Sequence, residues 1–416
     1  MTSDIIETWS VDQAQAVAVS LRLGAILVPK TVALVEAVGC ALAVAVTAPI
    51  DIPACDNAAM DGIAWAYADG VPSAGLHVIG SIVAGDSIGT LNPGRGECVR
   101  IMTGATLPDR CDTVAPIESC RIDGDQVHPT SAIAAGSHVR RRGEDIECGS
   151  LALDRGRCIG AGEIALLAAL GIDRVSVQSP LRVAVLSTGK ELARAGSAQL
   201  GASVFDSNAP MMMALLQRLG LQAVDAGVVD DDASDLVAAV AAAARHADVV
   251  ITTGGTGAGD ADHSSALAGL GWLRSGHVAI KPGRPLALGE VHRDDANATR
   301  VPLFCLPGNP VAALISYLMF VRPRLLAWQG FDARPVDRFD LATTAAIDKR
   351  RGRVEVVRAR YSRTAAGLQI APSMQQGSGM LRSLGDADAL IVLDESRGPV
   401  SSGETVEVWP LAGLLS

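Results

Sequence analysis

One stretch of the chain, residues 248–262, constrains the fold more than any other, because an apolar strand runs directly into a glycine-rich turn there. The β-branched run Val249–Thr253 is typical of a strand buried on both faces of a sheet. The glycines of the turn GGTGAG (Gly254–Gly259) allow positive φ angles and let a ligand approach the backbone closely. This combination is typical of an α/β protein that binds ligands at its sheet edge.

The residues after the turn add the chemistry of a binding site. We predict a helix over His263–Leu270, so that free N–H groups and the positive end of the helix dipole favour a phosphate at the turn. Asp260 and Asp262 supply carboxylates that can hold a divalent metal beside it. A glycine-rich turn is also consistent with a tight turn of no function, so the flanking segments have to decide.

Composition excludes several classes of protein. With 416 residues the chain has room for two to four domains, and its formal net charge of −10 argues against bulk nucleic-acid binding. An anionic ligand therefore requires a local basic pocket. The candidates are Arg140–Arg142, Lys281 with Arg284, and the group Arg350, Arg351 and Arg353.

Cysteine spacing and apolar runs predict the compartment. The eight cysteines form no CxxC pair and no metal-finger spacing, so we expect reduced, structural thiols. The N-terminal residues lack a basic segment followed by an apolar one, and the longest apolar stretch that we identify, Ala37–Ile50, is too short to span a bilayer. We expect a cytoplasmic protein with no membrane partner.

The pattern of apolar and polar residues divides the chain into four parts. Apolar-faced helices are predicted at Val11–Leu23, Val32–Val46 and Ala161–Leu170, with a β-rich insertion between the second and the third. Strands and helices alternate from about residue 180, which indicates a three-layer α/β domain with a parallel sheet, and a small β-barrel or sandwich follows. We assign residues 1–50 and 139–179 to a helical stalk domain, 51–138 to the inserted β-rich domain, 180–328 to the α/β domain and 329–416 to the C-terminal β domain.

Several polar segments fall at the strand ends of the α/β domain, where such sheets bind their ligands. They are Leu186–Glu191 (LSTGKE), Asp230–Asp232, the glycine-rich turn, Ile280–Pro285 (IKPGRP) and Leu306–Pro310 (LPGNP). Gly308 permits a sharp turn, Asn309 can cap the following helix, and Pro310 suits its first turn. Acids, cations and helix N-termini on one sheet edge are what metal-assisted handling of a phosphorylated ligand requires.

Some of these segments also have a purely structural interpretation. Asp230–Asp232 is equally consistent with a charge cluster at a helix N-terminus, and Glu191 with a capping residue. Outside the α/β domain, DNAAMDG (Asp56–Gly62) and RIMTGA (Arg100–Ala105) can be ordinary hairpin turns.

Together these segments resemble the MoeA family of molybdopterin molybdenumtransferases, which includes the E domains of gephyrin and of its plant counterpart. The resemblance runs from about residue 10 to the C-terminus and rests on motifs in the same order: DNAAMDG, RIMTGA, RRRGEDI, VAVLSTGKEL, FDSN, DVVITTGG, IKPGRP and LPGNP. It implies a multidomain α/β fold with a molybdopterin-binding domain, a helical stalk, an inserted β-rich domain and a C-terminal β-barrel. It also implies a homodimer with its active cleft between chains.

The resemblance implies an enzyme of molybdenum cofactor biosynthesis. Such a protein inserts molybdenum from molybdate into molybdopterin, and hydrolyses adenylylated molybdopterin with Mg²⁺ and release of AMP. Molybdoenzyme acceptors and other cofactor-biosynthesis proteins are further partners that it implies.

Carried over position by position, the resemblance assigns roles to residues of this sequence. The catalytic residues are Asp61, Asp231, Asp262 and Lys281, and the metal ligands are Glu191, Asp231 and Asp262. The substrate-binding residues are Thr103, Glu191, Gly254, Gly255, Thr256, Arg284, Pro307, Pro310, Arg353 and Ser378. Asp61 comes from the inserted domain, so it is expected to complete the site from the partner chain.

The sequence departs from the family pattern at three positions, one of which is His277, where the family often has a lysine. Gly257 stands where the family usually has a serine, so either Thr256 supplies the hydroxyl or a contact to the oxyanion is lost. Arg284 stands where the family usually has a lysine, which keeps the charge but changes the donor geometry. These changes leave open a paralogue specialised for another oxyanion, such as tungstate.

Two further functions compete with the transferase. One is a non-catalytic molybdopterin-binding carrier or scaffold, a use of this fold that gephyrin shows. The other is a generic nucleotide-binding protein, which is disfavoured because neither GxxxxGK[ST] nor GxGxxG with a following acid is present. The acids Asp61, Glu191, Asp231 and Asp262 favour the enzyme, because we expect them to be buried and to repel one another without a cation.

Overall fold

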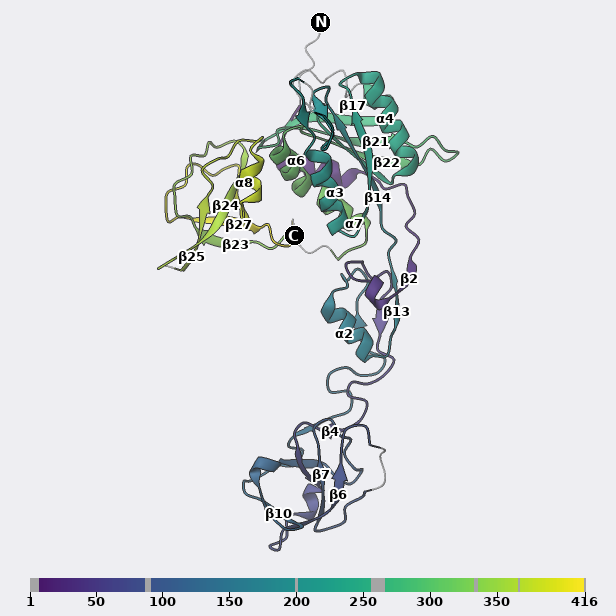
Figure 1. Ribbon diagram of the computed structural model, residues 1–416, viewed down its shortest axis with the longest axis vertical. Coiled ribbons are helices and arrows are strands. Elements are labelled where there is room, and N and C mark those ends of the chain that lie inside the picture. Colours follow the sequence, from purple (N-terminus) through teal and green to yellow (C-terminus); the bar gives the residue numbers. More distant parts are fainter. Residues whose placement is uncertain are drawn as a thin grey trace. The chain divides into compact units, whose positions relative to one another are not determined.

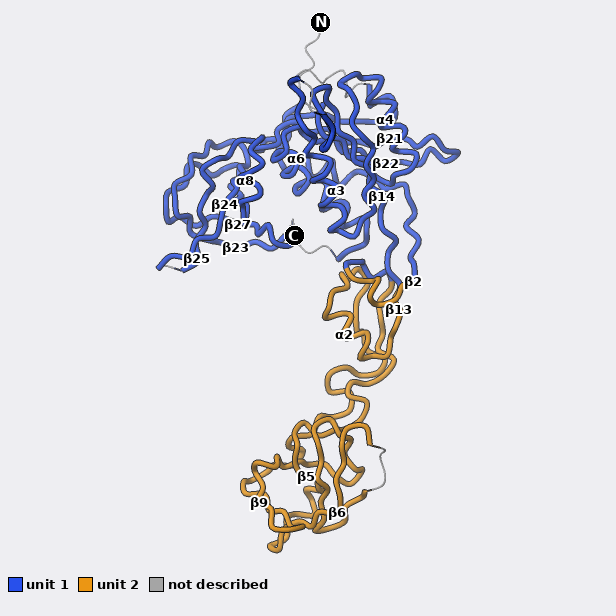
Figure 2. Tube along the Cα trace, viewed as in Figure 1, with its two compact units in different colours: residues 1–31, 39–43, 176–416 blue, residues 32–38, 44–175 orange. Residues whose placement is uncertain are grey.

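The computed structural model describes residues 7–86, 91–198, 201–255, 266–332, 336–365 and 367–414. These residues form two compact units, which Figure 2 colours separately. Unit 1 comprises residues 1–31, 39–43 and 176–416, and unit 2 comprises residues 32–38 and 44–175. The division of these units into the four predicted domains stays a prediction.

Unit 1 is built on a mixed seven-stranded sheet with the order β1-β19-β21-β22-β18-β14-β17. Its strands are β1 (Glu7–Trp9), β14 (Arg182–Thr188), β17 (Gln222–Val229), β18 (Val249–Thr253), β19 (Gly271–Val278), β21 (Pro285–His292) and β22 (Arg300–Leu306). Strands β22, β18, β14 and β17 are parallel, as predicted, whereas β21 runs antiparallel to both of its neighbours. The prediction of a wholly parallel sheet was therefore wrong. The short loop from β19 to β21 permits only an antiparallel return.

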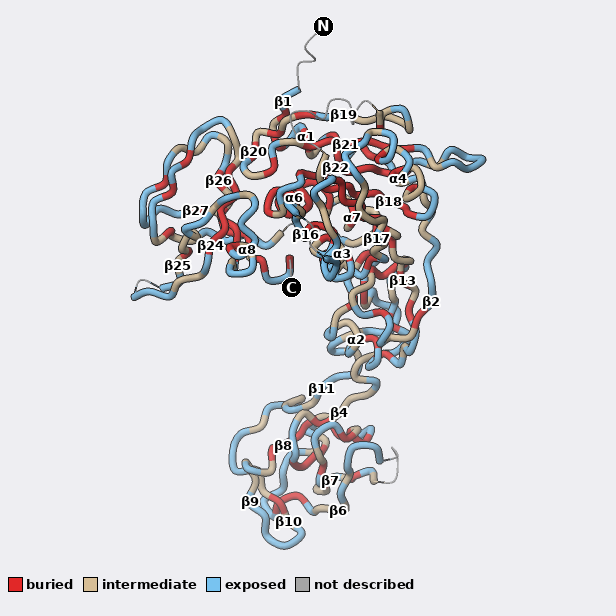
Figure 3. The backbone as a smooth tube through the Cα atoms, turned by 45° about the horizontal axis from the view of Figure 1, so that its top comes forward, coloured by how far each residue is buried: buried red, intermediate tan, exposed pale blue. Residues whose placement is uncertain are grey.

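Helices cover both faces of this sheet and give the three layers that the alternation predicts (Figure 1). Successive residues of β14 alternate between two cores: Val183 and Val185 join one, and Ala184 and Leu186 the other. The first core packs against α1 (Val11–Ser20), α3 (Asn208–Arg218), α6 (Pro310–Ser316), η4 (Tyr317–Val321) and α7 (Arg322–Trp328), and the second against α4 (Ala233–His246). Figure 3 shows this burial as the red segments around β18 and α6.

The N-terminal region differs from the prediction of two successive helices. Helix α1 forms at Val11–Ser20 and belongs to unit 1, because Ala14 and Ala18 pack into the first core. No α-helix forms over Val32–Val46. That region contains β2 (Lys30–Ala33), the one-turn 3-10 helix η1 (Leu34–Glu36) and β3 (Val46–Thr47), and Val35, Val38 and Val44 are exposed.

The C-terminal part of unit 1 is a barrel, as the resemblance implies. Its strands are β23 (Phe339–Ala342), β24 (Val354–Thr364), β25 (Gly367–Pro372), β26 (Ala389–Leu393) and β27 (Thr405–Pro410), with α8 at Leu381–Gly385. The sheet runs β25-β24-β26-β27-β23, and a bridge between Thr343 and Ile370 joins its two edges. The short strand β20 (Ile280–Lys281) pairs in parallel with β24.

Unit 2 contains the predicted β-rich insertion. Its six-stranded sheet has the order β8-β5-β7-β6-β10-β9. The strands are β5 (Gly62–Trp65), β6 (Leu76–Ile82), β7 (Glu97–Ile101), β8 (Thr113–Pro116), β9 (Cys120–Asp123) and β10 (Gln126–Pro129). The predicted helix at Ala161–Leu170 is confirmed as α2 (Ala161–Ala169). The pairs β4 (Asn57–Ala58) with β11 (Val139–Arg140), and β3 with β12 (Leu151–Leu153), flank the insertion.

One apolar helix exceeds the stretch that we identified as the longest. Pro310–Trp328 has the length and composition of a membrane span, with a mean hydropathy of 1.4, but 67% of that window is buried inside the protein. It is the core helix that runs through α6, η4 and α7. The eight cysteines are all free thiols, as expected.

Candidate active site

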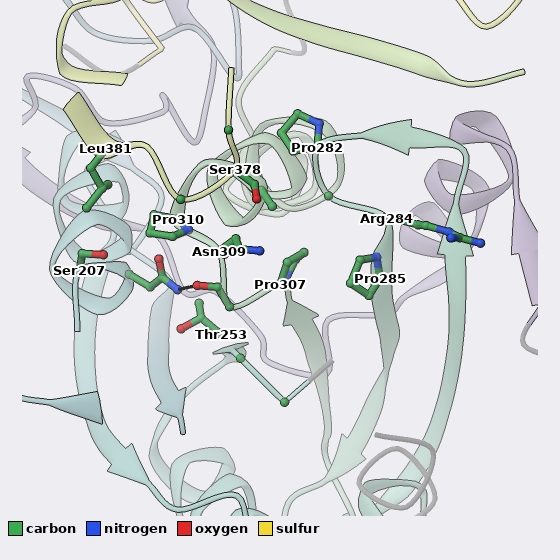
Figure 4. Close-up of a pocket in the computed structure, with 18 of the residues that line it drawn as sticks. Ser207, Thr253, Pro282, Arg284, Pro285, Pro307, Asn309, Pro310, Ser378 and Leu381 are labelled. Atoms are coloured by element: carbon green, nitrogen blue, oxygen red, sulfur yellow. Dashed lines mark hydrogen bonds between the residues drawn. The ribbon is translucent and has the colours of Figure 1, made fainter. Parts of the chain in front are cut away.

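A cavity of about 1050 Å³ lies at the carboxyl ends of the parallel strands of unit 1. The end of each of β14, β18 and β22 contributes to its wall, through Thr188, Thr253 and Pro307 respectively. Because β21 starts opposite the end of β22, the loop between β19 and β21 reaches the same edge. In Figure 4, Ser207 and Leu381 lie on one side of the cavity and Arg284 on the other.

The glycine turn forms the floor where β14, β18 and β22 meet. Gly254 and Gly255 have φ angles of +97° and +65°, as the sequence predicts for this turn. A Cβ atom on Gly254 would lie 2.2 Å from the carbonyl oxygen of Thr188, so no side chain fits there. The amide of Gly254 donates to the carbonyl of Leu306 at 3.1 Å, which joins the turn to the end of β22.

Two of the predicted metal ligands line this cavity. Asp231 accepts a hydrogen bond from the Thr188 hydroxyl at 3.1 Å, and Glu191 lies in the turn after β14. Asp232 instead caps α4 by accepting from the amides of Ser234 and Asp235, so the acidic cluster divides between the cavity and the helix. Glu191 and Asp231 are exposed, as is Asp61 of unit 2, so our expectation that these acids are buried was wrong for all three.

The carboxylates suit a hard divalent cation. Mg²⁺ is commonly held by one or two carboxylates together with substrate phosphates, and Glu191 and Asp231 provide that number. The third predicted ligand, Asp262, lies outside the described residues, as do Thr256 and residues 263–265 of the predicted helix at His263–Leu270; within the described part of that segment, residues 266–268 are helical. Within the described ranges, no group of three or more His, Cys, Asp or Glu side chains could hold a metal by itself.

Three cations line the same cavity. Lys281 Nζ lies 2.5 Å from Oε1 of Glu355, a buried residue of β24. Neither Arg284 nor Arg353 forms an ion pair with a described carboxylate. Burial, reinforced by the charge of Arg284, lowers the pKa of His277 and favours its neutral imidazole form. Three acids, Glu191, Asp206 and Asp231, line the cavity as well, so it gathers both signs of charge and offers local cations to an anionic ligand in this acidic protein.

The PGNP turn and the barrel together form another wall. Pro307 and Pro310 line the cavity, and the amide of Val311 donates to the carbonyl of Ser378 at 3.1 Å. Asn309 precedes α6 as its N-cap residue, but its side chain makes no capping hydrogen bond, so the prediction of a side-chain cap was wrong. The backbone of the barrel loop satisfies the helix start instead.

Asn208 supports the same turn from α3. Its Nδ2 donates to the carbonyl of Gly308 at 2.7 Å, which Figure 4 draws as a dashed line. Thr188, Thr253, Asn208 and Gln376 also line the cavity, although we had assigned them no role. Thr188, Thr253 and Asn208 lie inside the motifs quoted above, and Gln376 lies two residues before Ser378, so proximity to an assigned residue is the signal available in the sequence.

Unit 2 holds the remaining predicted residues. The backbone N–H and the hydroxyl of Thr103 both donate to Oδ1 of Asp61 at 2.7 Å. These two hydrogen bonds, the backbone one first, lower the pKa of Asp61. The two segments DNAAMDG and RIMTGA thus form one structural element.

Two residues of the basic run Arg140–Arg142 are engaged in ion pairs within unit 2. Arg141 pairs with Asp56 at 2.6 Å, and Arg142 with Asp51 at 2.5 Å. A backbone hydrogen bond from Cys148 and, to a smaller extent, the pairing with Arg142 lower the pKa of Asp51. Arg141 and Arg142 therefore pair within the insertion, whereas the three cations that line the cavity lie in unit 1.

Comparison with known families matches almost the whole chain. Residues 9–171 match the MoeA N-terminal region (domain I and II), 184–327 a probable molybdopterin binding domain, and 340–411 the MoeA C-terminal region (domain IV). The molybdopterin molybdenumtransferase of Haemophilus influenzae is 34% identical over 375 residues, which cover 89% of this chain and 91% of that protein. Molybdopterin molybdenumtransferase 2 of Mycobacterium tuberculosis is 32% identical over 399 residues, with 92% and 95% covered.

Solved structures agree with the sequence matches. A molybdopterin biosynthesis MoeA protein from Pyrococcus horikoshii superimposes with a TM-score of 0.81 at 25% identity, covering 97% of this chain and 100% of that one. A second structure of such a protein gives a TM-score of 0.77 at 28% identity, with 97% and 99% covered. The agreement extends over both units and the barrel.

Proposed function

This chain belongs to the MoeA family of molybdopterin molybdenumtransferases, enzymes of molybdenum cofactor biosynthesis, and from that premise we propose that it transfers molybdenum from molybdate to adenylylated molybdopterin, with Mg²⁺-dependent release of AMP. The observation that carries the proposal is the meeting of three carboxylates, of Glu191, Asp206 and Asp231, with three cations in one cavity at the sheet edge. A nucleotide-linked pyrophosphate and an oxyanion together require both signs of charge.

Glu191 and Asp231 are assigned to the metal. A Mg²⁺ ion bound there would neutralise negative charge on the pyrophosphate and polarise the bond to be broken. The Thr188 hydroxyl donates a hydrogen bond to Asp231 and so fixes the orientation of its carboxylate. Asp262 completes this set in our proposal.

Lys281, Arg284 and Arg353 are assigned to the anions, together with Ser378. Arginine can donate two parallel hydrogen bonds to an oxyanion or phosphate, whereas lysine acts as a compact point charge. Glu355 fixes the ammonium of Lys281 in the wall of the cavity. Gly254 and Gly255 permit close approach of the backbone to the ligand, and Pro307 and Pro310 shape the opposite wall.

Asp61 and Thr103 are assigned to the same reaction through a homodimer, in which unit 2 of a partner subunit would complete the cavity. The hydrogen bonds from Thr103 keep Asp61 ionised and oriented, which suits a residue that has to meet a cationic or hydrogen-bond-donating group. We further propose a cytoplasmic location, with molybdoenzyme acceptors or other cofactor-biosynthesis proteins downstream.

The test is release of AMP from adenylylated molybdopterin by purified protein and Mg²⁺, with molybdate, with tungstate, or with neither. Oxyanion-dependent release, with the metal retained on the pterin, is the expected result and identifies the anion. Tight pterin binding without AMP release under any condition would contradict the transferase and support the carrier. Glu191 and Asp231 are exposed, and exposed acids repel each other only weakly. Their proximity therefore does not by itself require a cation, and the carrier is the alternative that this test addresses.

A further inference from the structure

The barrel contains two buried cations, Lys349 and Arg358, which do not line the cavity. Each has 1% of its surface exposed. Buried charges normally pair with an opposite charge. Among the described residues, both of these cations donate their hydrogen bonds to backbone carbonyls instead.

Lys349 holds the turn that carries Arg353. Its Nζ donates to the carbonyls of Arg353 and Arg397 at 2.9 Å and of Arg350 at 3.3 Å. An ammonium group has three N–H donors, so these carbonyls satisfy it completely. Two of the three acceptors belong to residues 350–353, where Gly352 has a φ angle of +94°. The turn therefore closes around the ammonium group.

The same turn is joined both to the rest of the barrel and to the α/β part of unit 1. The amide of Gly352 donates to the carbonyl of Glu395 at 2.9 Å, and the amide of Val354 to the carbonyl of Ala279 at 2.8 Å. Strand β20 pairs there with β24, which places Ile280 opposite Val354 and Lys281 opposite Glu355. The position of Arg353 relative to Lys281 thus depends on the turn 350–353, whose carbonyls accept hydrogen bonds from Lys349.

Arg358 holds the segment that leads to Ser378. Its Nη2 donates to the carbonyls of Gln375 and Gly377 at 3.0 and 3.1 Å. The side-chain amide of Gln376 accepts from the backbone amide of Arg358 and donates to its carbonyl. Gln376, Gly377 and Ser378 all line the cavity.

These arrangements are costly for stability alone. Burial lowers the pKa values of both cations, and Nε and Nη1 of Arg358 have no partner among the described residues. An apolar side chain of similar volume would often stabilise a core more than such a buried charge. What these hydrogen bonds provide instead is a fixed position for two backbone segments, 350–353 and 375–378, which contribute Arg353 and Ser378 to the cavity.

We propose that Lys349 and Arg358 are positioning residues that hold Arg353 and Ser378 at the oxyanion-binding end of the cavity. The proposal rests on the proposed function, in which these two residues bind molybdate. Lys349 acts through Arg353, and Arg358 acts through the segment 375–378.

The test compares full-length Lys349→Met, Arg353→Ala and the double variant in AMP release at varied molybdate. Lys349→Met should raise the KM for molybdate about tenfold, the effect of one hydrogen bond to an anion, with little change in kcat. It should add nothing in the Arg353→Ala background. Arg358→Met should raise KM in the same way. An unchanged KM in Lys349→Met, or an additive double variant, would overturn the proposal.

Two controls separate positioning from stability. Ile391→Ala removes a fully buried barrel side chain, and it should lower Tm without raising KM. A similar rise in KM in that variant would show that general loosening of the barrel suffices. Lys349→Arg, which retains the charge, provides a folded comparison if the Met variant is unstable; it should show a smaller KM rise, and a normal KM would contradict the need for the lysine geometry.

Hydrogen exchange distinguishes failure of this proposal from failure of the proposed function. In Lys349→Met the amides of Gly352 and Val354 should exchange faster than in the unmodified protein, while those of β26 should not. This readout requires no turnover. Faster exchange in a protein that releases no AMP would contradict the proposed function and retain the positioning of the loop, and unchanged exchange would overturn the positioning itself.

Discussion

Lys281 and Glu355 form an ion pair with unequal environments: the side chain of Lys281 is 46% exposed, whereas that of Glu355 is 6% exposed. The pair joins β20 to the first part of β24, so it connects the cavity wall with the barrel. Oε2 of Glu355 is buried and has no partner among the described residues. The carboxylate therefore depends on Lys281 more than Lys281 depends on the carboxylate.

This asymmetry predicts different costs for the two single substitutions. Lys281→Met leaves a buried carboxylate without its partner and should lower the free energy of unfolding by about 1–3 kcal/mol, less than for a fully buried pair because Lys281 is half exposed. Glu355→Gln leaves an ammonium group that water can solvate, and it should cost less than about 1 kcal/mol. Urea unfolding of both variants measures the difference. Equal losses would show that the carboxylate is stabilised by other groups.

Two adjacent aspartates should separate catalysis from stability. Asp231→Asn removes a proposed metal ligand and should lower kcat for AMP release about 10²-fold or more, with unfolding unchanged. Asp232→Ala removes the cap of α4 and should cost about 0.5–2 kcal/mol of stability while kcat stays nearly constant. Steady-state kinetics and urea unfolding give both quantities. A normal kcat in Asp231→Asn would remove it from the site.

The ionisation of Asp61 should respond to Thr103. Its pKa is lowered below the ordinary value of 3.8, so its contribution to stability is present above that pH and is lost as the pH falls through the lowered pKa. Thr103→Val removes the hydroxyl donor but keeps the stronger backbone one, so the pKa should rise part of the way to 3.8. NMR titration of labelled aspartate carboxyls, with Asp61→Asn for assignment, measures it.

The matched control for that titration is Thr130→Val. The hydroxyl of Thr130 donates to the carbonyl of Ser119, which does not titrate, so the Asp61 signal should be unaffected. A constant Asp61 pKa in Thr103→Val would mean that the hydroxyl bond does not contribute in solution.

Gly254 should tolerate no side chain. Gly254→Ala would place a Cβ 2.2 Å from the backbone of Thr188 at a φ angle of +97°, so the ends of β14 and β18 would have to separate. Gly171→Ala meets no atom within 4 Å at a φ angle of +75° and should cost only the backbone strain, about 1–2 kcal/mol. Thermal unfolding should therefore rank Gly254→Ala well below Gly171→Ala. The reverse ranking would contradict close packing of the glycine turn.

Strand ends and turns were the features most accessible from the sequence. The run before Gly254, the LSTGKE segment and the PGNP turn all lie where the alternation of strands and helices places them, because positive φ angles, capping and period-two patterns depend on neighbouring residues. By contrast, Val32–Val46 has an apolar content that suits a helix, yet it consists mainly of a 3-10 turn, turns and bends, with Val35, Val38 and Val44 exposed. Apolar content alone therefore does not fix the period of the backbone.

The α/β order, the glycine turn and the family could be predicted from the amino-acid sequence, since each follows from residues that are adjacent in the chain. Three relationships emerge from the folded chain alone: β21 runs antiparallel to β22, Glu355 pairs with Lys281 across a separation of 74 residues, and Lys349 donates a hydrogen bond to the carbonyl of Arg353. These relationships depend on which distant segments pack together. A backbone carbonyl that accepts a hydrogen bond also cannot be recognised from the amino-acid sequence, because every residue carries a carbonyl group.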